Sequence, residues 1–322
     1  MCILMFRFLV LIMAVLACPV SQAETWPAKP IRIVVPFAPG GGSDAVARAI
    51  STKLGAGLGQ SVIVDNKPGA GGVLATVQVA AAPADGYTLL LADVPFAANI
   101  SVYAKPGYKL DDFAAVAQIA TVPSIVIVGQ HVPVKSLAEL VALAKSKPAQ
   151  LNMASGGAGG VAHLQGARFA YLTGITWTHV PYRGMGPAAL DVIGGQADLM
   201  FASAPTVMGH LKSGRVKALA VTSSTRSPLA PEVPTMAELG YPEMTADNWF
   251  GVVAPAKTDP AIVKKLHDQI NAAIASPEVK ALLAAQMATP APEAKPQDFE
   301  RVVKREIDIW AKTVKAANIS AN

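Results

Sequence analysis

The chain has 322 residues and a formal net charge of +5 at pH 7, with its Lys and Arg residues scattered and no basic run. Nucleic acid is therefore not an expected partner, despite the excess of basic residues. Both cysteines, Cys2 and Cys18, lie in the first 23 residues, which excludes a disulfide, a thiol nucleophile and a thiolate metal site from the rest of the chain. About 300 residues can bury one or two hydrophobic cores.

Residues 1–23 have the organisation of a secretory signal peptide. Arg7 precedes an apolar run from Phe8 to Ala17, and Ser21-Gln22-Ala23 is a small-x-small cleavage site. The run is shorter than the ~20 apolar residues that a membrane span requires. A rival interpretation places a lipid on Cys18, although the residues around that cysteine fit a lipoprotein cleavage box poorly. We expect export to the periplasm and a mature chain with a charge of +4, since the leader carries one positive charge.

The next seventy residues alternate between predicted strands and helices. A β-branched run predicts a strand over 31–37, and apolar residues on one helical face predict a helix over 44–54. A strand over 61–64, a helix over 73–82 and a strand over 87–92 follow. This order predicts a parallel sheet flanked by helices.

The same theme returns further along the chain. Strands are predicted over 125–128, 151–154, 176–180, 197–201 and 216–222, with helices over 136–145, 162–172 and 187–193. Ser136 caps the first of these helices, with Glu139 at its third position. The last stretch predicts a strand over 249–254 and helices over 260–275, 277–286 and 296–317. Two successive α/β units predict two lobes rather than one large sheet.

The chain is expected to pass between these lobes twice, near residues 118–123 and 247–252. Lobe 1 then comprises residues 24–122 and 248–322, and lobe 2 comprises residues 123–247. No low-complexity linker is visible. Strand-like segments should therefore join the lobes.

The segment Pro39-Gly40-Gly41-Gly42-Ser43-Asp44 lies between a predicted strand and a predicted helix. Glycines there allow backbone N–H groups to face a ligand, and the helix N-terminus favours negative charge. An ordinary tight turn capped by Ser43 or Asp44 is the alternative, but three consecutive glycines are more than such a turn requires. The spacing fits neither a Walker loop nor a dinucleotide fingerprint. The segment therefore predicts an anion-binding turn.

A second glycine loop, Ser155-Gly156-Gly157-Ala158-Gly159-Gly160, has the same context in the other half. Two such loops, each opening a helix in a separate lobe, predict facing jaws on one ligand. His163 falls in the first turn of the second helix, where a lone histidine more often packs or caps than catalyses. Arg183 follows a strand and either pairs with a carboxylate or is a solvated charge. A third glycine-rich segment, residues 66–72, either joins the same rim or forms a simple turn.

Catalytic motifs are missing from the sequence. No serine lies in a Gly-x-Ser-x-Gly elbow, and there is no His-Glu-x-x-His or aspartate-rich metal box. The five histidines show no ligand spacing. We expect no enzymatic activity, no metal and no cofactor.

Seven motifs connect these segments to a known family. They are Trp26-Pro27-x-Lys29-Pro30-Ile31, Val35-Pro36-Phe37-Ala38-Pro39-Gly40-Gly41, Asn66-Lys67-Pro68-Gly69-Ala70-Gly71-Gly72, Asp85-Gly86-Tyr87-Thr88-Leu89-Leu90, His179-Val180-Pro181-Tyr182-Arg183-Gly184, Gly194-Gly195-Gln196-Ala197-Asp198-Leu199-Met200-Phe201 and Trp249-Phe250-Gly251. With them the chain resembles, from about Trp26 to its C-terminus, the Bug family of periplasmic receptors, the binding components of tripartite tricarboxylate transporters. So many ordered motifs make the resemblance specific.

The resemblance implies a two-lobed Venus-flytrap fold of the type II periplasmic binding proteins, each lobe a mostly parallel sheet flanked by helices. A small carboxylate would lie between the lobes, held largely by main-chain N–H groups of the two glycine loops. Family ligands include di- and tricarboxylates, acidic amino acids and aromatic carboxylates. A monomer that delivers its ligand to a two-subunit membrane permease is implied. The alternative is a ligand sensor that presents the solute to a membrane signalling partner.

Combining loops and resemblance gives a set of expected ligand-binding residues. They are Phe37, Ala38, Pro39, Gly40, Gly41, Gly42, Ser43, Asp44, Asp93, Ser155, Gly156, Gly157, Ala158, Gly159, Gly160, His163, Tyr182, Arg183, Gly184 and Ala202. Several depart from the family pattern: Gly156 and Gly160 replace common hydroxyl residues, and Ala202 replaces a frequent Asp. Asp93 stands where Thr, Ser or Asn is usual, and is either a partner for a cationic ligand group or a solvated loop acid.

Overall fold

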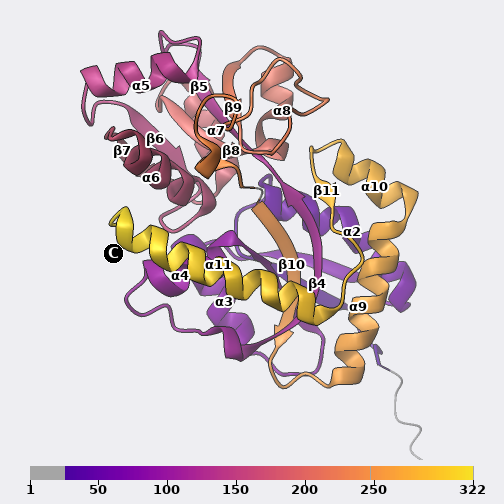
Figure 1. Cartoon of the computed structure of the whole chain (residues 1–322). Helices are drawn as coiled ribbons and strands as arrows, with labels where there is room; N and C mark the ends of the chain where they lie inside the picture. Colours follow the sequence, from indigo (N-terminus) through magenta and orange to yellow (C-terminus); the bar gives the residue numbers. More distant parts are fainter. Residues whose placement is uncertain (1–25, 247, 322) are drawn as a thin grey trace, which may run out of the picture.

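The computed structural model describes residues 26–246 and 248–321, which form two α/β lobes (Figure 1). The expected signal peptide lies outside the described residues. Lobe 1 contains the strands β1 (Ile31–Val35), β2 (Val62–Asn66), β3 (Thr88–Asp93), β4 (Phe113–Val122), β10 (Asn248–Pro255) and β11 (Thr289–Pro290). Lobe 2 contains β5 (Ser124–Gly129), β6 (Asn152–Ser155), β7 (Thr178–Pro181), β8 (Leu199–Ser203) and β9 (Val216–Val221).

Each lobe has one sheet, and both sheets are mixed. The order is β11-β4-β10-β3-β1-β2 in lobe 1 and β7-β6-β8-β5-β9 in lobe 2. β1 pairs parallel with β2 and β3, and β6 pairs parallel with β7 and β8, as the βαβ pattern predicts. β10 pairs antiparallel with β3 and β4, and β5 with β8 and β9. The expectation of mostly parallel sheets therefore needs correction. Strands that arrive from the other lobe enter the sheet without a helical crossover, so they run against its βαβ strands.

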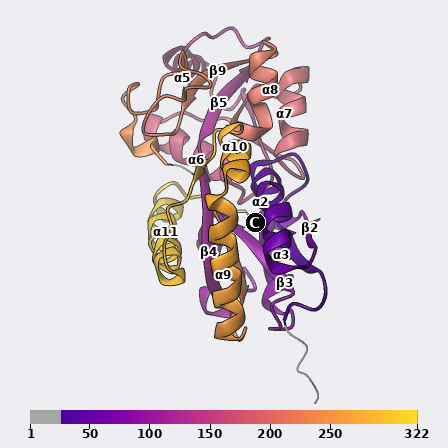
Figure 2. The same ribbon diagram turned by 90° about the vertical axis from the view of Figure 1, so that its right-hand side faces the viewer.

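Helices cover both faces of the sheet in lobe 1 (Figure 2). They are α2 (Gly42–Leu58), α3 (Val73–Ala80), α4 (Val94–Val102), α9 (Pro260–Ala275), α10 (Pro277–Ala284) and α11 (Pro296–Ala316). The alternation of β1 divides the core: Ile31 and Ile33 pack in the cluster that holds residues of α2 and α9, whereas Val34 packs with residues of α3, α4 and α11. Side chains on the two faces of β1 thus pack against different layers of helices.

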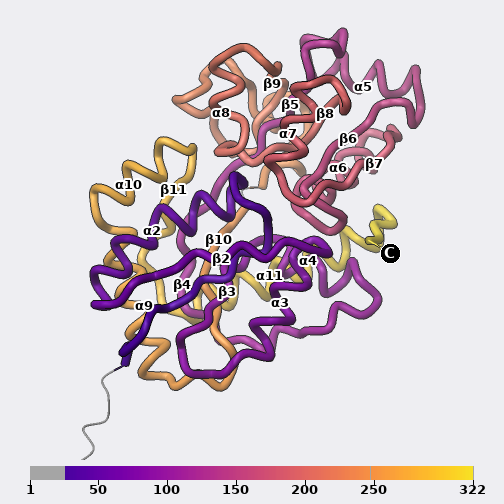
Figure 3. The backbone as a smooth tube through the Cα atoms, turned by 180° about the vertical axis from the view of Figure 1, so that it is seen from behind, coloured from indigo at the N-terminus to yellow at the C-terminus, as the bar shows by residue number. Residues whose placement is uncertain are grey.

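The sheet of lobe 2 packs with the helices α5 (Leu137–Ser146), α6 (Val161–Thr173), α7 (Met185–Gly194) and α8 (Ala204–Lys212), which Figure 3 shows from behind. The ring of Phe169 in α6 packs at a tilt of 56° against the ring of Phe201 in β8, with 5.8 Å between the ring centroids. Ser136 caps α5 as predicted, since its hydroxyl accepts the backbone N–H of Glu139 at 3.2 Å. Short 3₁₀ turns lie at Ala70–Gly72, Leu110–Asp112 and Pro242–Met244.

Four strands and helices were not predicted from the sequence: β4, β11, α4 and α8. α4 is apolar on nearly every side, because β3, α3 and α11 enclose it. A helix buried all round shows no amphipathic period, so the pattern that identifies surface helices is absent.

Two strands connect the lobes. β4 continues through Pro123 into β5, and the chain returns to lobe 1 in β10. The side-chain amide of Asn248 donates to the carbonyl of Val122 at 3.1 Å and to the hydroxyl of Ser124 at 2.9 Å. These bonds join the outgoing and the returning segment where the chain passes between the sheets.

Candidate functional site

A small cavity lies between the lobes, beside both glycine loops. Lobe 1 contributes Phe37, Gly41, Gly42, Ser43, Asp93, Asn248 and Phe250, and lobe 2 contributes Gly156, Gly160, Val161, Met185 and Ser203. The cavity volume is about 30 Å³. That is room for one or two water molecules, so the lobes are closed in this structure.

Three helices begin at the cavity wall: α2 at Gly42, α6 at Val161 and α7 at Met185. Their N-cap residues are all glycines, and none has a side chain that accepts the first backbone N–H groups. A helix N-terminus carries partial positive charge on its unpaired N–H groups. Convergence of three such termini from two lobes creates a field that favours an anion.

The first loop approaches lobe 2 so closely that only glycine fits at one position. A Cβ atom at Gly42 would overlap the hydroxyl of Ser203 and would lie 3.2 Å from its Cβ. A Cβ at Gly41 would lie 3.7 Å from that of Met185, an ordinary contact. Gly42 therefore permits the lobes to close, while Gly41 tolerates a small side chain.

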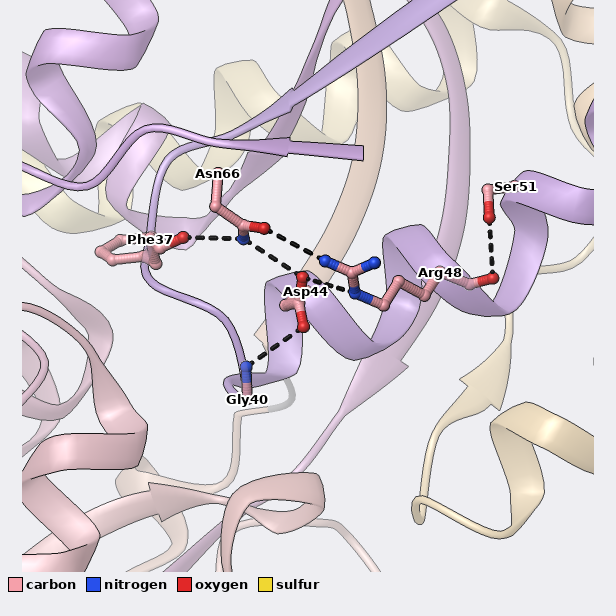
Figure 4. Close-up of polar contacts among 6 residues, drawn as sticks. All are labelled: Phe37, Gly40, Asp44, Arg48, Ser51 and Asn66. Atoms are coloured by element: carbon pink, nitrogen blue, oxygen red, sulfur yellow. Dashed lines mark hydrogen bonds and ion pairs between the residues drawn. The ribbon is translucent and has the colours of Figure 1, made fainter. Parts of the chain in front are cut away.

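Asp44 supports this loop from inside lobe 1 rather than lining the cavity (Figure 4). Its carboxylate accepts the N–H of Gly40 at 3.1 Å, Nε of Arg48 at 2.9 Å and the amide of Asn66 at 3.1 Å. Asn66 also donates to the carbonyl of Phe37 at 2.9 Å. Burial alone would raise the pKa of Asp44, but hydrogen bonds from Arg48, Gly40 and Asn66 outweigh it and hold the pKa below its usual value.

The second loop has two functions along its length. Gly156 and Gly160 line the cavity, whereas residues 157–159 face lobe 1. The hydroxyl of Tyr103 donates to the carbonyl of Ala158 at 3.0 Å, and a Cβ at Gly71 would overlap the same carbonyl. The third glycine-rich segment thus contacts the tip of the second loop when the lobes are closed.

His163 lies behind the second loop and is not among the residues that line the cavity. Its Nδ1 accepts the backbone N–H of Gly159 at 3.1 Å, so that nitrogen carries no proton. Its ring stacks on His179 at 4.0 Å between centroids. Burial, together with the nearby His179, lowers the pKa of His163 to about 4. The neutral imidazole therefore supports the loop.

Ser155 forms a pair with His179, with Oγ and Nε2 2.6 Å apart. Burial lowers the pKa of His179. The Ser155 side chain also accepts the N–H of Gly157 at 3.2 Å and has no solvent exposure. A serine enclosed in this way cannot meet a substrate, so the pair stabilises the loop and is no nucleophile–base dyad.

Asp93 is the one ionisable side chain among the residues that line the cavity. Ser43 donates its hydroxyl to Oδ2 of Asp93 at 3.0 Å, and Asp93 is 5% exposed. Burial raises the pKa of Asp93 to about 7, against the opposing effects of hydrogen bonds from the Ser43 hydroxyl and the Phe96 backbone N–H. It is therefore a buried group and no solvated loop acid.

The remaining expected residues lie around the cavity rather than in its wall. Ala38, Pro39 and Gly40 form the outer part of the first loop, which meets Gly184 of lobe 2. Tyr182 donates to Asp191 at 2.7 Å, and Arg183 is exposed. Ala202 is fully buried in β8, with its side chain on the opposite face of the strand from Ser203.

The sequence reasoning missed Ser203, Asn248, Phe250, Met185 and Val161 as cavity residues. Ser203 was one position from the expected Ala202, and in a strand one position reverses the side of the sheet. Residues 199–203 show no period-2 alternation, so the signals available were the helix starts at Val161 and Met185.

A larger cavity of about 480 Å³ lies on the other side of the strands that join the lobes, between α6 and α11. Its wall includes Arg168 and Arg305, but also Glu243 and Glu306. The larger cavity thus has charged side chains of both signs in its wall, whereas Asp93 is the one ionisable side chain in the wall of the glycine-lined cavity. Among residues 26–246 and 248–321 there is no group of three His, Cys, Asp or Glu residues placed to hold a metal.

Known proteins are similar to this chain over nearly its whole length. The model of a family described as "Tripartite tricarboxylate transporter family receptor" matches residues 46–319. Protein BugT of Bordetella pertussis is 42% identical over 303 residues, which cover 93% of this chain and 92% of the relative.

Solved structures extend this likeness to three dimensions. The periplasmic binding protein BugD is 35% identical with a TM-score of 0.88, covering 92% of this chain and 99% of that one. A protein of R. palustris solved with adipate is 36% identical with a TM-score of 0.87, at the same coverage. MatC of Rhodopseudomonas palustris, solved with bound malate, is 33% identical with a TM-score of 0.86 and covers 90% of this chain and 100% of that one. The two-lobed periplasmic-binding-protein fold and the absence of an enzymatic role, both predicted, are confirmed by these matches.

Proposed function

Because this chain belongs to the tripartite tricarboxylate transporter receptor family, we propose that it captures a small carboxylate between its two lobes and delivers it to a membrane permease of that transporter type. Relatives solved with adipate and with malate support this ligand class. The observation that carries the proposal is the convergence of three uncapped helix N-termini, from both lobes, on one cavity. A carboxylate there would accept several backbone N–H groups at once.

The ligand contacts are proposed to come from the cavity wall. Gly41, Gly42 and Ser43 would offer backbone N–H groups from lobe 1, and Val161 would do so from lobe 2. The N–H of Gly160 already donates to the carbonyl of Gly157 at 3.0 Å. His163 and Asp44 would act indirectly by holding the two loops in place. The exposed Arg183 has no part in this arrangement.

Ligand binding requires the lobes to separate from the arrangement in this structure, since a volume of about 30 Å³ is too small for a carboxylate. We place the hinge at Pro123 and Asn248, between a lobe of residues 24–122 and 248–322 and a lobe of residues 123–247. Both connections are single strands, so rotation about them leaves each core intact. The ligand would then shift the population from open to closed by bonding to both lobes at once.

Export to the periplasm is proposed from two considerations. Residues 1–23 have signal-peptide organisation, and the matched BugD is a periplasmic binding protein. In the part of the chain that the structure describes, no helix is both long and apolar enough to cross a membrane. Delivery to a permease requires a receptor on the outer side of the inner membrane.

A ligand screen tests the proposal. The chain without residues 1–23 is purified and its melting temperature is measured with a library of mono-, di- and tricarboxylates. A ligand that binds only the folded state raises the melting temperature with the logarithm of its concentration over Kd. We expect a clear shift with a few carboxylates and one-to-one binding in calorimetry. The absence of a shift with every carboxylate would contradict the proposed ligand class.

A further inference from the structure

Two buried polar atoms in the wall of the small cavity have no hydrogen-bond partner. They are Oδ1 of Asp93, from lobe 1, and Oγ of Ser203, from lobe 2. The two residues are 5% and 4% exposed. The other buried side-chain atoms without a partner in the described residues belong to Asn99, Gln165, Thr206, Trp249 and Gln286, none of which lines this cavity. Unpaired polar atoms from both lobes thus occur together in this cavity, as they also do in the larger cavity, which Gln165 and Trp249 line.

Such atoms are costly when the protein is closed. A buried acceptor without a donor loses its hydration and gains nothing in return. Ser43 occupies Oδ2 of Asp93, and the backbone N–H of Phe96 also interacts with the carboxyl group, while Oδ1 has no hydrogen bond of ordinary geometry. The hydroxyl of Ser203 lies against Gly42 of α2, and Gly42 has no side chain that could pair with it.

The charges of the wall limit what that partner can be. No Lys, Arg or His lines the cavity, and its one ionisable side chain is an acid. Above its pKa of about 7, the Asp93 carboxylate would repel a second carboxylate on a ligand held at the helix N-termini, whereas it would pair with a hydrogen-bond donor. A bifunctional ligand satisfies both parts of the wall.

We propose that Asp93 and Ser203 form a subsite for a hydrogen-bond donor, a hydroxyl or an ammonium group, carried by the carboxylate ligand. The inference rests on the proposed receptor function and names the chemistry of its ligand: a hydroxy acid or an amino acid rather than a plain carboxylic acid. The donor bridges the lobes, so the subsite also favours closure. Ser203 is then a specificity-determining residue beside Asp93.

Calorimetry with matched carboxylates tests the subsite. The probes are propionate, lactate and alanine, then succinate, malate and aspartate, then glutarate, 2-hydroxyglutarate and glutamate. In at least one series we expect the hydroxyl or amino member to bind about tenfold or more tightly than the unsubstituted acid, as for a hydrogen bond to a charged group. Tighter binding of the hydroxy acid would identify the donor as a hydroxyl group, and tighter binding of the amino acid would identify it as an ammonium group.

Variants assign the preference to residues. Asp93→Asn and Ser203→Ala should each reduce the preference for the substituted member by about threefold or more, and Asp93→Asn should leave the unsubstituted acid bound equally or better. Thr206→Val is the matched control, because it removes a buried partnerless hydroxyl that lies outside the cavity. Ser203→Ala removes only a partnerless hydroxyl and keeps the test valid if Asp93→Asn folds poorly.

The outcomes separate the two proposals. If unsubstituted acids bind wild type as tightly as their hydroxyl and amino counterparts, the subsite is contradicted while the receptor function stands. The same holds if both variants keep the wild-type preference. If no carboxylate binds the wild type, the proposed function fails, and the subsite with it.

Discussion

The hydroxyl of Ser43 donates to Oδ2 of Asp93 across 3.0 Å and thereby joins the first turn of α2 to the end of β3. The N-terminus of α2 favours an anionic group of a ligand, whereas the carboxyl group of Asp93 favours a hydrogen-bond donor. The hydrogen bond from Ser43 holds the two together within lobe 1. Lobe 2 contributes further helix termini and Ser203 to the same cavity. Ligand affinity should therefore depend on closure as much as on any single contact.

Gly42→Ala tests the close approach of the lobes. Its Cβ would overlap Ser203, so we expect affinity for a carboxylate to fall by about tenfold or more, as for overpacking of a closed interface. Alanine is the better helix former, so the ligand-free protein should melt at the same or a higher temperature. Calorimetry and thermal melts measure both. Gly41→Ala is the control, with its Cβ at 3.7 Å from Met185. Equal loss of affinity in both variants would contradict the steric explanation.

Tyr103→Phe tests the interlobe hydrogen bond to Ala158. The bond exists only when the lobes are closed, so its loss should weaken ligand binding by about two- to tenfold. The melting temperature without ligand should change little. Tyr108→Phe is the matched control, because it removes a hydrogen bond to Phe96 within lobe 1. Tyr108→Phe should lower stability and leave ligand affinity unchanged. If Tyr108→Phe weakened ligand binding and Tyr103→Phe did not, the role of the Tyr103 hydrogen bond in closure would be contradicted.

Asp93→Asn should change how stability depends on pH. Burial raises the pKa of Asp93 to about 7, so the folded state keeps a proton that the unfolded chain releases near pH 4. The stability contributed by Asp93 is therefore greatest below pH 4 and is lost as pH rises to about 7. The variant should gain stability relative to wild type over this window, by a few kcal/mol at most. Chemical denaturation at pH 4.5, 6 and 8 measures it, and a constant difference would refute the assignment.

His163→Gln should have the opposite pH signature. Burial beside His179 lowers the pKa of His163 to about 4, so the unfolded chain binds a proton that the folded state excludes. Stability from this group is complete above pH 6.5 and falls as pH drops toward 4, by up to ~3 kcal/mol. Wild type should lose stability more steeply than the variant between pH 6.5 and 4.5. Parallel curves would show that His163 is not neutral in the fold.

Local patterns sufficed for part of the site. Three glycines between a strand and a helix identified Gly41, Gly42 and Ser43, because a strand–turn–helix unit determines its own geometry. Asp93 was recognised as unusual because the family that the chain resembles usually has Thr, Ser or Asn at this position, but its burial depends on α4, which was not predicted from the sequence. A residue's surroundings cannot be read where the element that covers it is missed.

Other cavity residues depend on contacts between distant segments. Asn248 reaches Val122 and Ser124 more than 120 positions away, and no local periodicity records such a contact. Ser203 and its neighbour Ala202 lie on opposite faces of β8, and only Ala202 was expected at the site. In the second glycine loop, Gly156 and Gly160 line the cavity, but the intervening residues contact Tyr103 and Gly71 instead. Which face of a loop meets the other lobe is decided by closure, which is a tertiary property.

The most direct test of carboxylate capture between the lobes is calorimetric titration of the chain without residues 1–23, as wild type and as Gly42→Ala, with the carboxylate that gives the largest thermal shift. We expect one-to-one binding by the wild type and binding at least about tenfold weaker by the variant, with both proteins folded. Equal affinity of the two proteins would contradict a ligand enclosed by Gly42 and Ser203 and would move the binding site away from the glycine loops.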